Sequence, residues 1–581
     1  MRIEEKAAYP RPDFIRENYI HLNGSWQFAF DDDGSLYKSA EAGADFTLPL
    51  KINVPFPYQS SESGIGTEEK HEKVIYKKIF EVNNRQYKTA LLHFGAVDRE
   101  AEVFLNKKYL GSHTGGYTPF QFDVSGILKD GENELVVCVT DEFRPDTVRG
   151  KQIFEGEPYG CFYTPVTGIW QDVWLELTGG DYITDVRFVT DFDSRSVTAE
   201  VSFDKTVKGR LSAVVSKKGE ECFNITAGVH GRSARLLFSF DDCGMKDKEK
   251  FVWAPSHPNL FDTLFTLETE NGADTVDTYF GIRKISTSGD KIYFNNSQLY
   301  LRAVLDQGYF TEGIYRPADD NNFKRDVELT LALGFNCARK HQKIEDPKYY
   351  YYADLLGLLV WGELPSFFGF TESACREAET TMREFIERDR NHPSIIAWVP
   401  FNESWGLRSL LGDGRQADFA RELYYLCRRL DPERLVSTND GWENVTPTDF
   451  HGIHDYRSLN EKLAEYYSDT AFFENGAART GHPYLVPGEK YEGKPVLFTE
   501  FGGKRIAGAD GWGYDLPLET TEKYLADIKS DVDFIFKIPT FCGYCYTQLT
   551  DVYQEKNGLL YPDRTPKADI ERLKEIFSSR S

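Results

Sequence analysis

The chain has 581 residues, a formal net charge of −24, and 40% hydrophobic and 14% aromatic residues. At about 100–200 residues per domain, this length predicts three domains, each large enough for its own core. The composition excludes a disordered or fibrous protein. No apolar run approaches the roughly 20 residues that a membrane span needs. The chain also lacks the cluster of Lys and Arg that binding to a nucleic-acid backbone requires. Because the first residues carry no apolar segment typical of a secretory signal, we expect a cytoplasmic protein without nucleic-acid or membrane partners.

The nine cysteines are odd in number and scattered along the chain. This distribution predicts reduced thiols rather than a disulfide framework. Cys542 and Cys545 form a C-x-x-C pair, but the pair lies inside an apolar, aromatic run and has no second pair beside it. We therefore expect both side chains to pack in a core.

Two all-β domains are expected first, in residues 1–180 and 181–283. The first range consists of short alternating runs such as NGSWQFAF, KVIYKKIF and NELVVCV, separated by Gly, Pro, Asn and Asp. The second contains further short runs, among them VTAEVSF and ARLLFSF. Alternation with period two, broken by turn residues, indicates antiparallel β-sandwiches, and the second has the size of an immunoglobulin-like domain.

The third domain, residues 284–581, shows a different pattern, in which apolar strand-like runs alternate with helical segments. This alternation predicts a parallel α/β fold, and eight runs in about 300 residues predict a (β/α)₈ TIM barrel. The runs lie at 299–307, 334–341, 357–363, 394–403, 434–440, 449–456, 495–500 and 543–551.

These eight runs begin apolar and end polar or charged. Since the carboxyl ends of the strands form the active site of such barrels, we expect their last side chains to converge at one mouth. They are Asp306, Arg339, Lys340, His341, Glu363, Asn402, Glu403, Asp440, His454, Tyr456, Glu500 and Tyr546.

Glu403 and Glu500 each close an apolar run, after IIAWVPFN and PVLFT. A charged group at the end of a buried strand is costly to desolvate unless it is paired or used. Two facing carboxylates at a barrel mouth are the groups that glycoside hydrolysis requires. The pattern therefore favours a glycosidase.

Several segments resemble glycoside hydrolase family 2, which includes β-galactosidases, β-glucuronidases and β-mannosidases. The segments NHPSIIAWVPFNESWG and KPVLFTEFGG are similar to its acid/base and nucleophile motifs. RPDFIRENYIHLNGSWQFAFD, HFGAVDREAEVFLN and GIWQDVW are similar to its jelly-roll sugar-binding domain, and LRAVLDQGYF and GFNCARKH to its first barrel strands. The resemblance covers the whole chain and implies an N-terminal jelly roll in front of the immunoglobulin-like sandwich and the TIM barrel.

This resemblance implies a retaining, exo-acting hydrolysis by double displacement, with Glu403 as acid/base and Glu500 as nucleophile. The two roles need opposite protonation states at one pH. We expect Arg339 and Tyr456 to donate hydrogen bonds to Glu500 and to keep it ionised. A tryptophan side chain would give Glu403 more apolar surroundings.

The remaining candidate site residues are expected to contact the sugar. The resemblance implies that Asn402 hydrogen-bonds its 2-hydroxyl group. Polar side chains that converge on the sugar would form hydrogen bonds with its other hydroxyl groups and so select their orientation. Aromatic rings would stack on the faces of the sugar. These residues are Asp306, Lys340, His341, Glu363 and His454, with Trp405, Trp442 and Tyr546 as the aromatic surfaces. Tyr546 stands where the family has a tryptophan that faces the substrate.

Two departures from the family bear on substrate and metal. Family β-glucuronidases grip the sugar carboxylate with Asn-x-Lys near the end of the barrel, where this chain has Glu555, Lys556 and Asn557. Large β-galactosidases bind magnesium through a Glu/His cluster after strand three, where this chain has GELPSFFGFTES without His. The first departure disfavours a glucuronide, with Lys556 and Arg564 left as candidates for binding an acid. From the second we expect no catalytic metal, and we expect no other cofactor.

We expect a β-galactosidase that hydrolyses terminal sugar residues. A β-glucuronidase, a β-galacturonidase and an α-L-arabinosidase of the same family remain alternatives, as does a catalytically silent carbohydrate-binding protein. Because loops of one subunit often complete a neighbour's site in this family, a homodimer or homotetramer is expected. The ending GLLYPDRTPK indicates a chain that stops with the barrel, without the C-terminal β domains of larger galactosidases.

Overall fold

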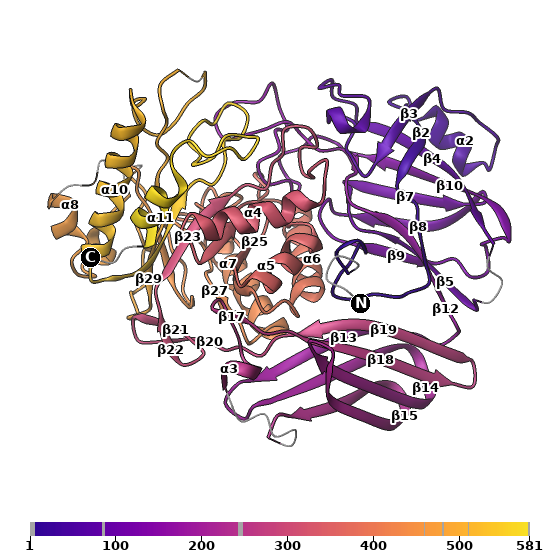
Figure 1. Ribbon diagram of the computed structural model, residues 1–581. Coiled ribbons are helices and arrows are strands. Elements are labelled where there is room, and N and C mark those ends of the chain that lie inside the picture. The colour runs from indigo at the N-terminus through magenta and orange to yellow at the C-terminus, as the bar shows by residue number, and fades with distance from the viewer. Residues whose placement is uncertain are drawn as a thin grey trace.

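The computed structural model describes residues 6–83, 87–241, 248–457, 459, 461–478, 481–508 and 510–578. Figure 1 shows an N-terminal β-sandwich beside the barrel, with a second β-sandwich along the lower side of both. The last strand of the first sandwich ends at Thr178 and the next strand begins at Ile183. The last long strand of the second sandwich ends at Phe280, and the segment leading into the barrel begins at Ile285.

The N-terminal sandwich packs a four-stranded sheet, in the order β1-β12-β5-β9, against a six-stranded sheet, β3-β2-β4-β10-β7-β8. Neighbouring strands in both sheets are antiparallel, as the alternating runs predict. The inner faces form one apolar core that includes Trp26, Tyr76 and Val137. The elements are β1 (Tyr19–His21), β2 (Gly24–Phe30), α2 (Ser35–Glu41), β3 (Leu50–Val54), η1 (Ser61–Ser63), β4 (Lys73–Val82), β5 (Thr89–Phe94), β6 (Val97–Asp98), β7 (Glu100–Leu105), β8 (Lys108–Thr114), β9 (Phe120–Asp123), β10 (Gly131–Thr140), β11 (Gly168–Ile169) and β12 (Val173–Thr178).

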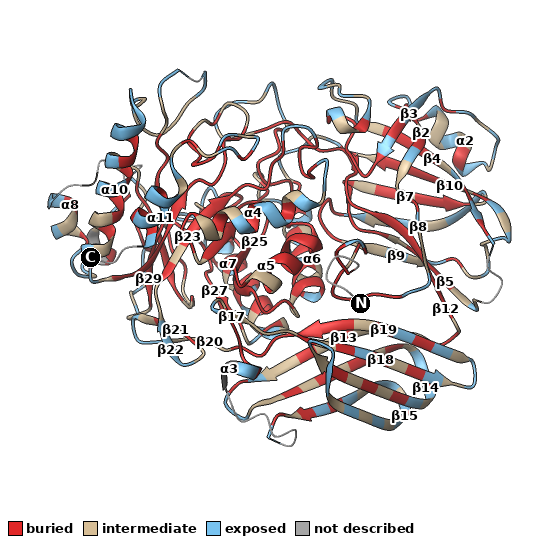
Figure 2. Ribbon diagram, viewed as in Figure 1, coloured by how far each residue is buried: buried red, intermediate tan, exposed pale blue. Residues whose placement is uncertain are grey.

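The second sandwich is built on a long β14/β15 hairpin with an irregular register between Ser202 and Val207. On one side of this irregularity β14 pairs with β13, and on the other with β18. Figure 2 shows buried and more exposed residues alternating along these strands, as expected for a sheet with one face on the core. The elements are β13 (Ile183–Asp191), β14 (Ser196–Lys217), β15 (Glu220–Ser239), α3 (Lys248–Phe251), β16 (Trp253–Ala254), β17 (His257–Pro258), β18 (Phe261–Thr269) and β19 (Gly272–Phe280).

The C-terminal domain contains the predicted eight parallel strands, in the order β27-β26-β25-β24-β23-β30-β29-β28. Each of the eight predicted runs contains one strand or most of it. Between β27 and β28, Asp449 links the two ends, because its N–H donates to the Val436 carbonyl at 2.8 Å and its carboxylate accepts from the Val436 N–H at 2.9 Å. The strands are β23 (Leu301–Asp306), β24 (Cys337–Lys340), β25 (Leu359–Glu363), β26 (Ile395–Val399), β27 (Leu435–Val436), β28 (His451–His454), β29 (Val496–Gly502) and β30 (Phe541–Thr547).

Helices surround this barrel, and a small sheet that precedes it packs beneath the strands. Ile292 and Phe294 of that sheet share a buried cluster with Leu301 and Ala303 at the start of the barrel. The helices are α4 (Asn321–Ala332), α5 (Pro347–Leu356), α6 (Glu372–Asp389), α7 (Gly414–Leu430), α8 (Glu461–Tyr466), α9 (Phe472–Asn475), α10 (Thr521–Lys537) and α11 (Ile570–Ser578), and the small sheet consists of β20 (Ile285–Ser288), β21 (Lys291–Phe294) and β22 (Ser297–Leu299). None of the helices within the described ranges is long and apolar enough to cross a membrane.

The C-x-x-C pair packs in the barrel, as expected. Cys542 and Cys545 are both free and buried. Cys243 lies outside the described residues. The pair therefore contributes to the core.

Candidate active site at the barrel mouth

The two glutamates that the sequence singled out lie at the carboxyl end of the barrel, which we call the mouth. Glu500 is within β29, whereas Glu403 follows β26 in a turn and has a left-handed backbone with φ of 52°. The Glu403 N–H donates to the carbonyl of Asp440 at 2.8 Å, and Asn402 forms a parallel bridge to Asp440. A left-handed conformation is uncommon for a residue other than glycine and is maintained here by these contacts.

His454, the last residue of β28, lies between the two carboxylates. Its Nδ1 is 2.7 Å from a carboxylate oxygen of Glu403, and its Nε2 is 3.5 Å from an oxygen of Glu500 and 2.9 Å from one of Asp440. One oxygen of each glutamate and one ring nitrogen lie within 4.8 Å of one another. Against the effect of burial, the three carboxylates raise the pKa of His454 to about 10, so its ring is an imidazolium at neutral pH.

Glu500 has the two partners that the sequence predicts for it. The Tyr456 hydroxyl donates to one oxygen at 2.7 Å, and the Arg339 guanidinium is 3.2 Å from the other. Tyr456 also contacts the Thr547 hydroxyl at 2.9 Å and stacks on Tyr514. Burial raises the pKa of Glu500, and the positive charges of His454 and Arg339 oppose that rise. The partners are as expected, but in the substrate-free site burial outweighs their stabilisation of the ionised form.

Arg339 forms the centre of a buried polar network with Glu363 and Asn402, which we call the floor of the mouth. Its side chain is fully buried and donates to Glu363 at 2.7 Å and to the Asn402 side-chain oxygen at 2.6 Å. Glu363 in turn lies 3.0 Å from a ring nitrogen of His341. Against the effect of burial, Arg339 and His341 lower the pKa of Glu363 to about 2. Asn402 is thereby oriented beside both catalytic candidates.

Asp306 and Lys340 form a separate ionic cluster next to this floor. The Lys340 ammonium lies 2.7 Å from Asp306 and 2.7 Å from Glu345. Trp442 is on the other side of the mouth, with its ring edge-on to His454 at 5.7 Å. The structure thus brings these candidates to the mouth, although Lys340 is already paired with acceptors of the chain.

The two other aromatic candidates have different surroundings from those expected. Trp405 packs against Phe162 of the N-terminal sandwich, with the rings stacked at 5.4 Å, so part of its surface is covered. The expectation that Tyr546 faces the substrate is wrong, because its ring packs on Phe577 of α11 and on Phe501, in the layer outside the barrel. Side chains of a strand alternate between faces, so its neighbour Thr547 reaches Tyr456 instead.

A loop of the N-terminal sandwich, residues 149–163, covers part of the mouth. The carbonyl of Gly160 accepts from the Trp512 indole N–H at 2.8 Å and from the Gln554 amide at 2.8 Å. The Tyr163 hydroxyl donates to Glu555. Burial raises the pKa of the Cys161 thiol to about 11. The negative charges of Glu403 and Glu500 contribute to this rise, so Cys161 is close enough to the mouth to interact with both. The sequence analysis did not predict this loop, nor Tyr514, as part of the site.

The segment that replaces Asn-x-Lys directs no free cation into the mouth. Glu555 is buried and also accepts from the Asn557 amide at 3.0 Å. The side chain of Lys556 lines a different pocket, with Tyr309 and Phe310. Arg564, a further candidate for binding an acid, is paired with Asp326 of α4 at 3.0 Å.

Within the described part of the chain, Glu403, His454 and Glu500 are the group whose spacing would suit a metal ion. Both ring nitrogens of His454 are already paired with carboxylates of the chain, Nδ1 with Glu403 at 2.7 Å and Nε2 with Asp440 at 2.9 Å. A metal would also have to lie near the Arg339 guanidinium, which is 3.2 Å from Glu500. The same residues are better suited to acid/base and nucleophilic chemistry.

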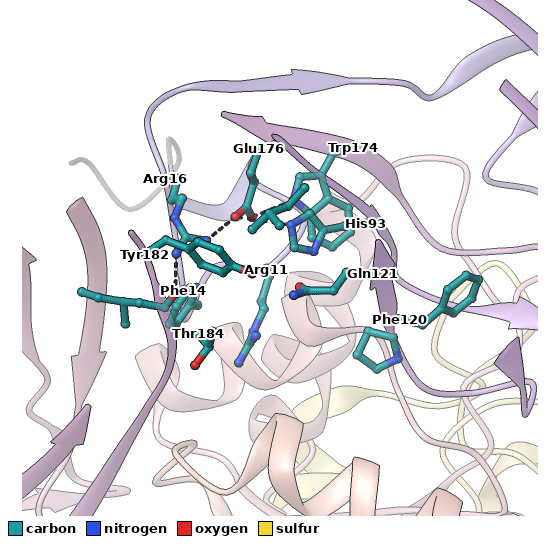
Figure 3. A pocket seen from close by; sticks show the side chains of 13 residues that line it. Arg11, Phe14, Arg16, His93, Phe120, Gln121, Trp174, Glu176, Tyr182 and Thr184 are labelled. Carbon is teal, nitrogen blue, oxygen red and sulfur yellow. Dashed lines mark hydrogen bonds and ion pairs between the residues drawn. The ribbon is translucent and has the colours of Figure 1, made fainter. Parts of the chain in front are cut away.

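A second pocket of interest lies where the two β domains meet (Figure 3). Its volume is about 280 Å³, and none of its lining residues comes from the barrel. Its carboxylate, Glu176, is bound by Arg16, and the His93 ring stacks on Trp174 at 4.7 Å. It holds no second carboxylate that could pair with Glu176 for glycoside hydrolysis.

Comparisons with known proteins identify the two outer domains of the chain. Residues 19–178 match the model of the glycosyl hydrolases family 2 sugar binding domain, and residues 285–580 match that of its TIM barrel domain. A β-galactosidase from Thermoanaerobacter pseudethanolicus is 27% identical over 92% of this chain and 72% of its own length. A putative β-glucuronidase from Formosa agariphila is 26% identical over 80% of this chain, which spans 57% of that protein. The solved β-glucuronidase of Ruminococcus gnavus has a TM-score of 0.78 at 19% identity, covering 98% and 99% of the two chains.

The barrel with its paired carboxylates and these matches define a glycoside hydrolase, an enzyme that acts on carbohydrate substrates. More narrowly, the chain belongs to glycoside hydrolase family 2.

Proposed function

We propose that the protein is a retaining, exo-acting β-glycosidase that hydrolyses neutral sugars, with β-galactosides as the preferred class. The observation that carries the retaining mechanism is the short separation of the two carboxylates, whose nearest oxygens lie within 4.8 Å. Retaining enzymes hold their carboxyl groups about 5–5.5 Å apart, whereas inverting enzymes need about 6.5–9.5 Å to admit a water.

In the first step, Glu403 donates a proton to the glycosidic oxygen while a carboxylate oxygen of Glu500 attacks the anomeric carbon. The bond from this carbon to the leaving oxygen breaks, and a glycosyl ester of Glu500 forms. In the second step, Glu403 takes a proton from water, which attacks the same carbon and releases Glu500. The imidazolium of His454, 2.7 Å from Glu403 and 3.5 Å from Glu500, balances the negative charge of the pair.

The charges around the mouth support a neutral sugar. A uronide would bring a third carboxylate beside Glu403 and Glu500, and it would also meet the buried Glu555. The cations of the corresponding segment, Lys556 and Arg564, are directed elsewhere or paired. The loop of residues 149–163 narrows the mouth, which favours removal of terminal residues over cleavage within a chain.

The acid role of Glu403 is tested by comparing Glu403→Gln with wild type on two galactosides. One carries an activated nitrophenyl leaving group, and the other carries a poor alkyl leaving group. We expect the variant to lose about 1,000-fold in kcat/KM with the poor leaving group and less than about tenfold with the activated one, because only the former needs the proton. Equal losses with both would refute the assignment. A mechanism-based fluorosugar followed by intact-protein mass analysis should label Glu500, and absence of the label would favour a silent binding protein.

The sugar class is tested on a panel of nitrophenyl glycosides that includes galactoside, glucuronide, galacturonide and both arabinosides. We expect the galactoside to have the highest kcat/KM. A dominant uronide or arabinoside activity would reject the substrate while leaving the roles of the two glutamates intact.

A further inference from the structure

Lys151 is held over the barrel mouth by the backbone on either side of it. The N–H groups of Arg149 and Gly150 donate to the Ser366 carbonyl at 3.2 and 2.9 Å, and the Tyr163 N–H donates to the Lys151 carbonyl at 2.9 Å. Gly150 has φ of 59°, and a Cβ there would lie 2.2 Å from the Gln342 carbonyl oxygen. This approach, possible only for glycine, brings Lys151 beside the end of β24.

Lys151 is 6% exposed, and its ammonium makes no hydrogen bond or ion pair with any residue that the structure describes. Its contact is with the ring of Tyr163, whose centroid is 6.0 Å away. The Lys151 Nζ atom is not among the fully buried polar atoms that lack a partner, so the ammonium retains access to solvent and is available to donate to a bound ligand.

The positive charge of Lys151 affects the pKa of two groups at the mouth, His341 and Glu500. Burial lowers the pKa of His341 to about 3, and the positive charge of Lys151 adds to the effect. Burial raises the pKa of Glu500, and Lys151 is among the charges that oppose the rise. The charge of Lys151 thus acts on His341, after β24, and on Glu500, in β29, in agreement with the approach of Gly150 to the Gln342 carbonyl at the end of β24.

The surroundings favour a hydroxyl group over a carboxylate as its acceptor. A hydroxyl oxygen can accept from an ammonium without adding charge, whereas a carboxylate would be repelled by Glu403, Glu500 and Glu555. Carboxylate recognition commonly uses more than one donor, and of the cations in the corresponding segment Arg564 is paired with Asp326 and Lys556 lines another pocket.

We propose that Lys151 of the N-terminal sandwich donates a hydrogen bond to a hydroxyl group of the sugar bound against Glu500. The N-terminal sandwich then contributes directly to the substrate site, and Lys151 determines specificity for a hydroxyl group at one position of a neutral sugar. This inference rests on the proposed function, and its tests separate the two.

The test compares Lys151→Met with wild type on nitrophenyl β-galactoside and on its monodeoxy analogues. We expect kcat/KM on the parent galactoside to fall about 10- to 100-fold, the range for a hydrogen bond to a charged donor. One deoxy analogue should be hydrolysed equally by both proteins, because it lacks the acceptor. Lys151→Arg should recover part of the activity, and Lys108→Met on the exposed strand β8 is the matched control for loss of a lysine.

Equal loss on every analogue would show that Lys151 only supports the loop, and would overturn the proposal. A larger loss on nitrophenyl β-glucuronide than on the galactoside would identify a carboxylate receptor and overturn it too. If Lys151→Met does not fold, as judged by thermal melting, the same series is measured with Lys151→Gln. If wild type prefers another neutral glycoside, the proposed galactoside fails, and the series on that sugar still decides the role of Lys151.

Discussion

Two buried glutamates, Glu500 at the barrel mouth and Glu176 between the β domains, have the same types of partner but differ in how completely these partners bind them. Glu500 at the barrel mouth has Arg339, His454 and Tyr456 as partners. Glu176, in the pocket between the β domains, has Arg16 and His93 beside it (Figure 3) and also accepts from the Tyr9 hydroxyl. The types of partner therefore do not distinguish a reactive carboxylate from a structural one.

The difference lies in how completely each carboxylate is bound. Glu176 accepts from the Tyr9 hydroxyl at 2.5 Å, from the Trp174 indole at 2.9 Å and from Arg16. Against the effect of burial, His93 and Arg16 hold its pKa well below the usual range. Glu500 has one oxygen without a hydrogen bond from any described residue, and burial raises its pKa.

Competition for the arginine is the physical reason for this difference. Arg339 is within ion-pair distance of three carboxylates, those of Glu363, Asp440 and Glu500, and its contact with Glu500 is the longest at 3.2 Å. Arg16 serves two, Glu176 and Asp274. A carboxylate that its neighbours leave partly unsatisfied retains an oxygen for a substrate carbon.

The largest predicted effect is the opposite outcome of the same substitution at the two sites. Glu500→Gln should lower kcat by about 10,000-fold or more, because it removes the proposed nucleophile, with little change in the melting temperature. Glu176→Gln should destabilise the fold by about 3 kcal/mol, because it removes one of the two carboxylates that balance the buried Arg16 and leaves only Asp274. Kinetics on nitrophenyl galactoside and urea unfolding measure the two effects.

The comparison fails if Glu176→Gln, assayed under conditions where it is folded, loses as much activity as Glu500→Gln. It also fails if Glu500→Gln unfolds at a urea concentration as low as Glu176→Gln does. Glu500→Ala with added azide is a further check, because an external nucleophile can restore turnover only where the carboxylate itself reacts.

His454 and His93 extend the comparison to pH dependence. His454→Asn should lower kcat/KM about 100-fold, the range for loss of one electrostatic contact at the reacting groups. Removing this positive charge should also raise the pKa of Glu500, so the acidic limb of the kcat/KM profile should move to higher pH. His93→Asn is the matched control and should leave the profile unchanged.

The same histidine gives a stability prediction with a definite sign. The pKa of His454 rises from 6.5 to about 10 on folding, so its contribution is fully present below pH 6.5 and is lost as the pH rises through about 10. Urea unfolding at pH 7 and pH 10 should show a larger decrease in stability for wild type than for His454→Asn. Equal decreases would mean that the ring is not protonated in the native protein.

The sequence predicted the fold and the two carboxylates because both depend on local patterns. Apolar runs with polar ends located all eight barrel strands, and Glu403 and Glu500 followed from the ends of two of them. The contact of the N-terminal loop with the mouth could not be predicted, because Lys151 and Glu500 are brought together only by tertiary packing. Asp440 was predicted to lie at the mouth from its place at a strand end, but nothing local indicated that it would bind His454.

The orientation of side chains in β30 was missed for a simpler reason, and it leads to the smallest predicted effect. Tyr546 was assigned to the inner face because it stands where the family has a tryptophan that faces the substrate, and one position along the strand reverses the face on which a side chain lies. Its hydroxyl has no hydrogen bond from any described residue and its ring lies in the layer beneath α11, so Tyr546→Phe should change kcat and KM by less than about twofold. Thr547→Val should instead lower kcat by about three- to tenfold, because it removes the contact that orients Tyr456 on Glu500. Initial rates for the two variants decide which of these adjacent residues faces the mouth, and the reverse order of effects would restore the substrate-facing role of Tyr546.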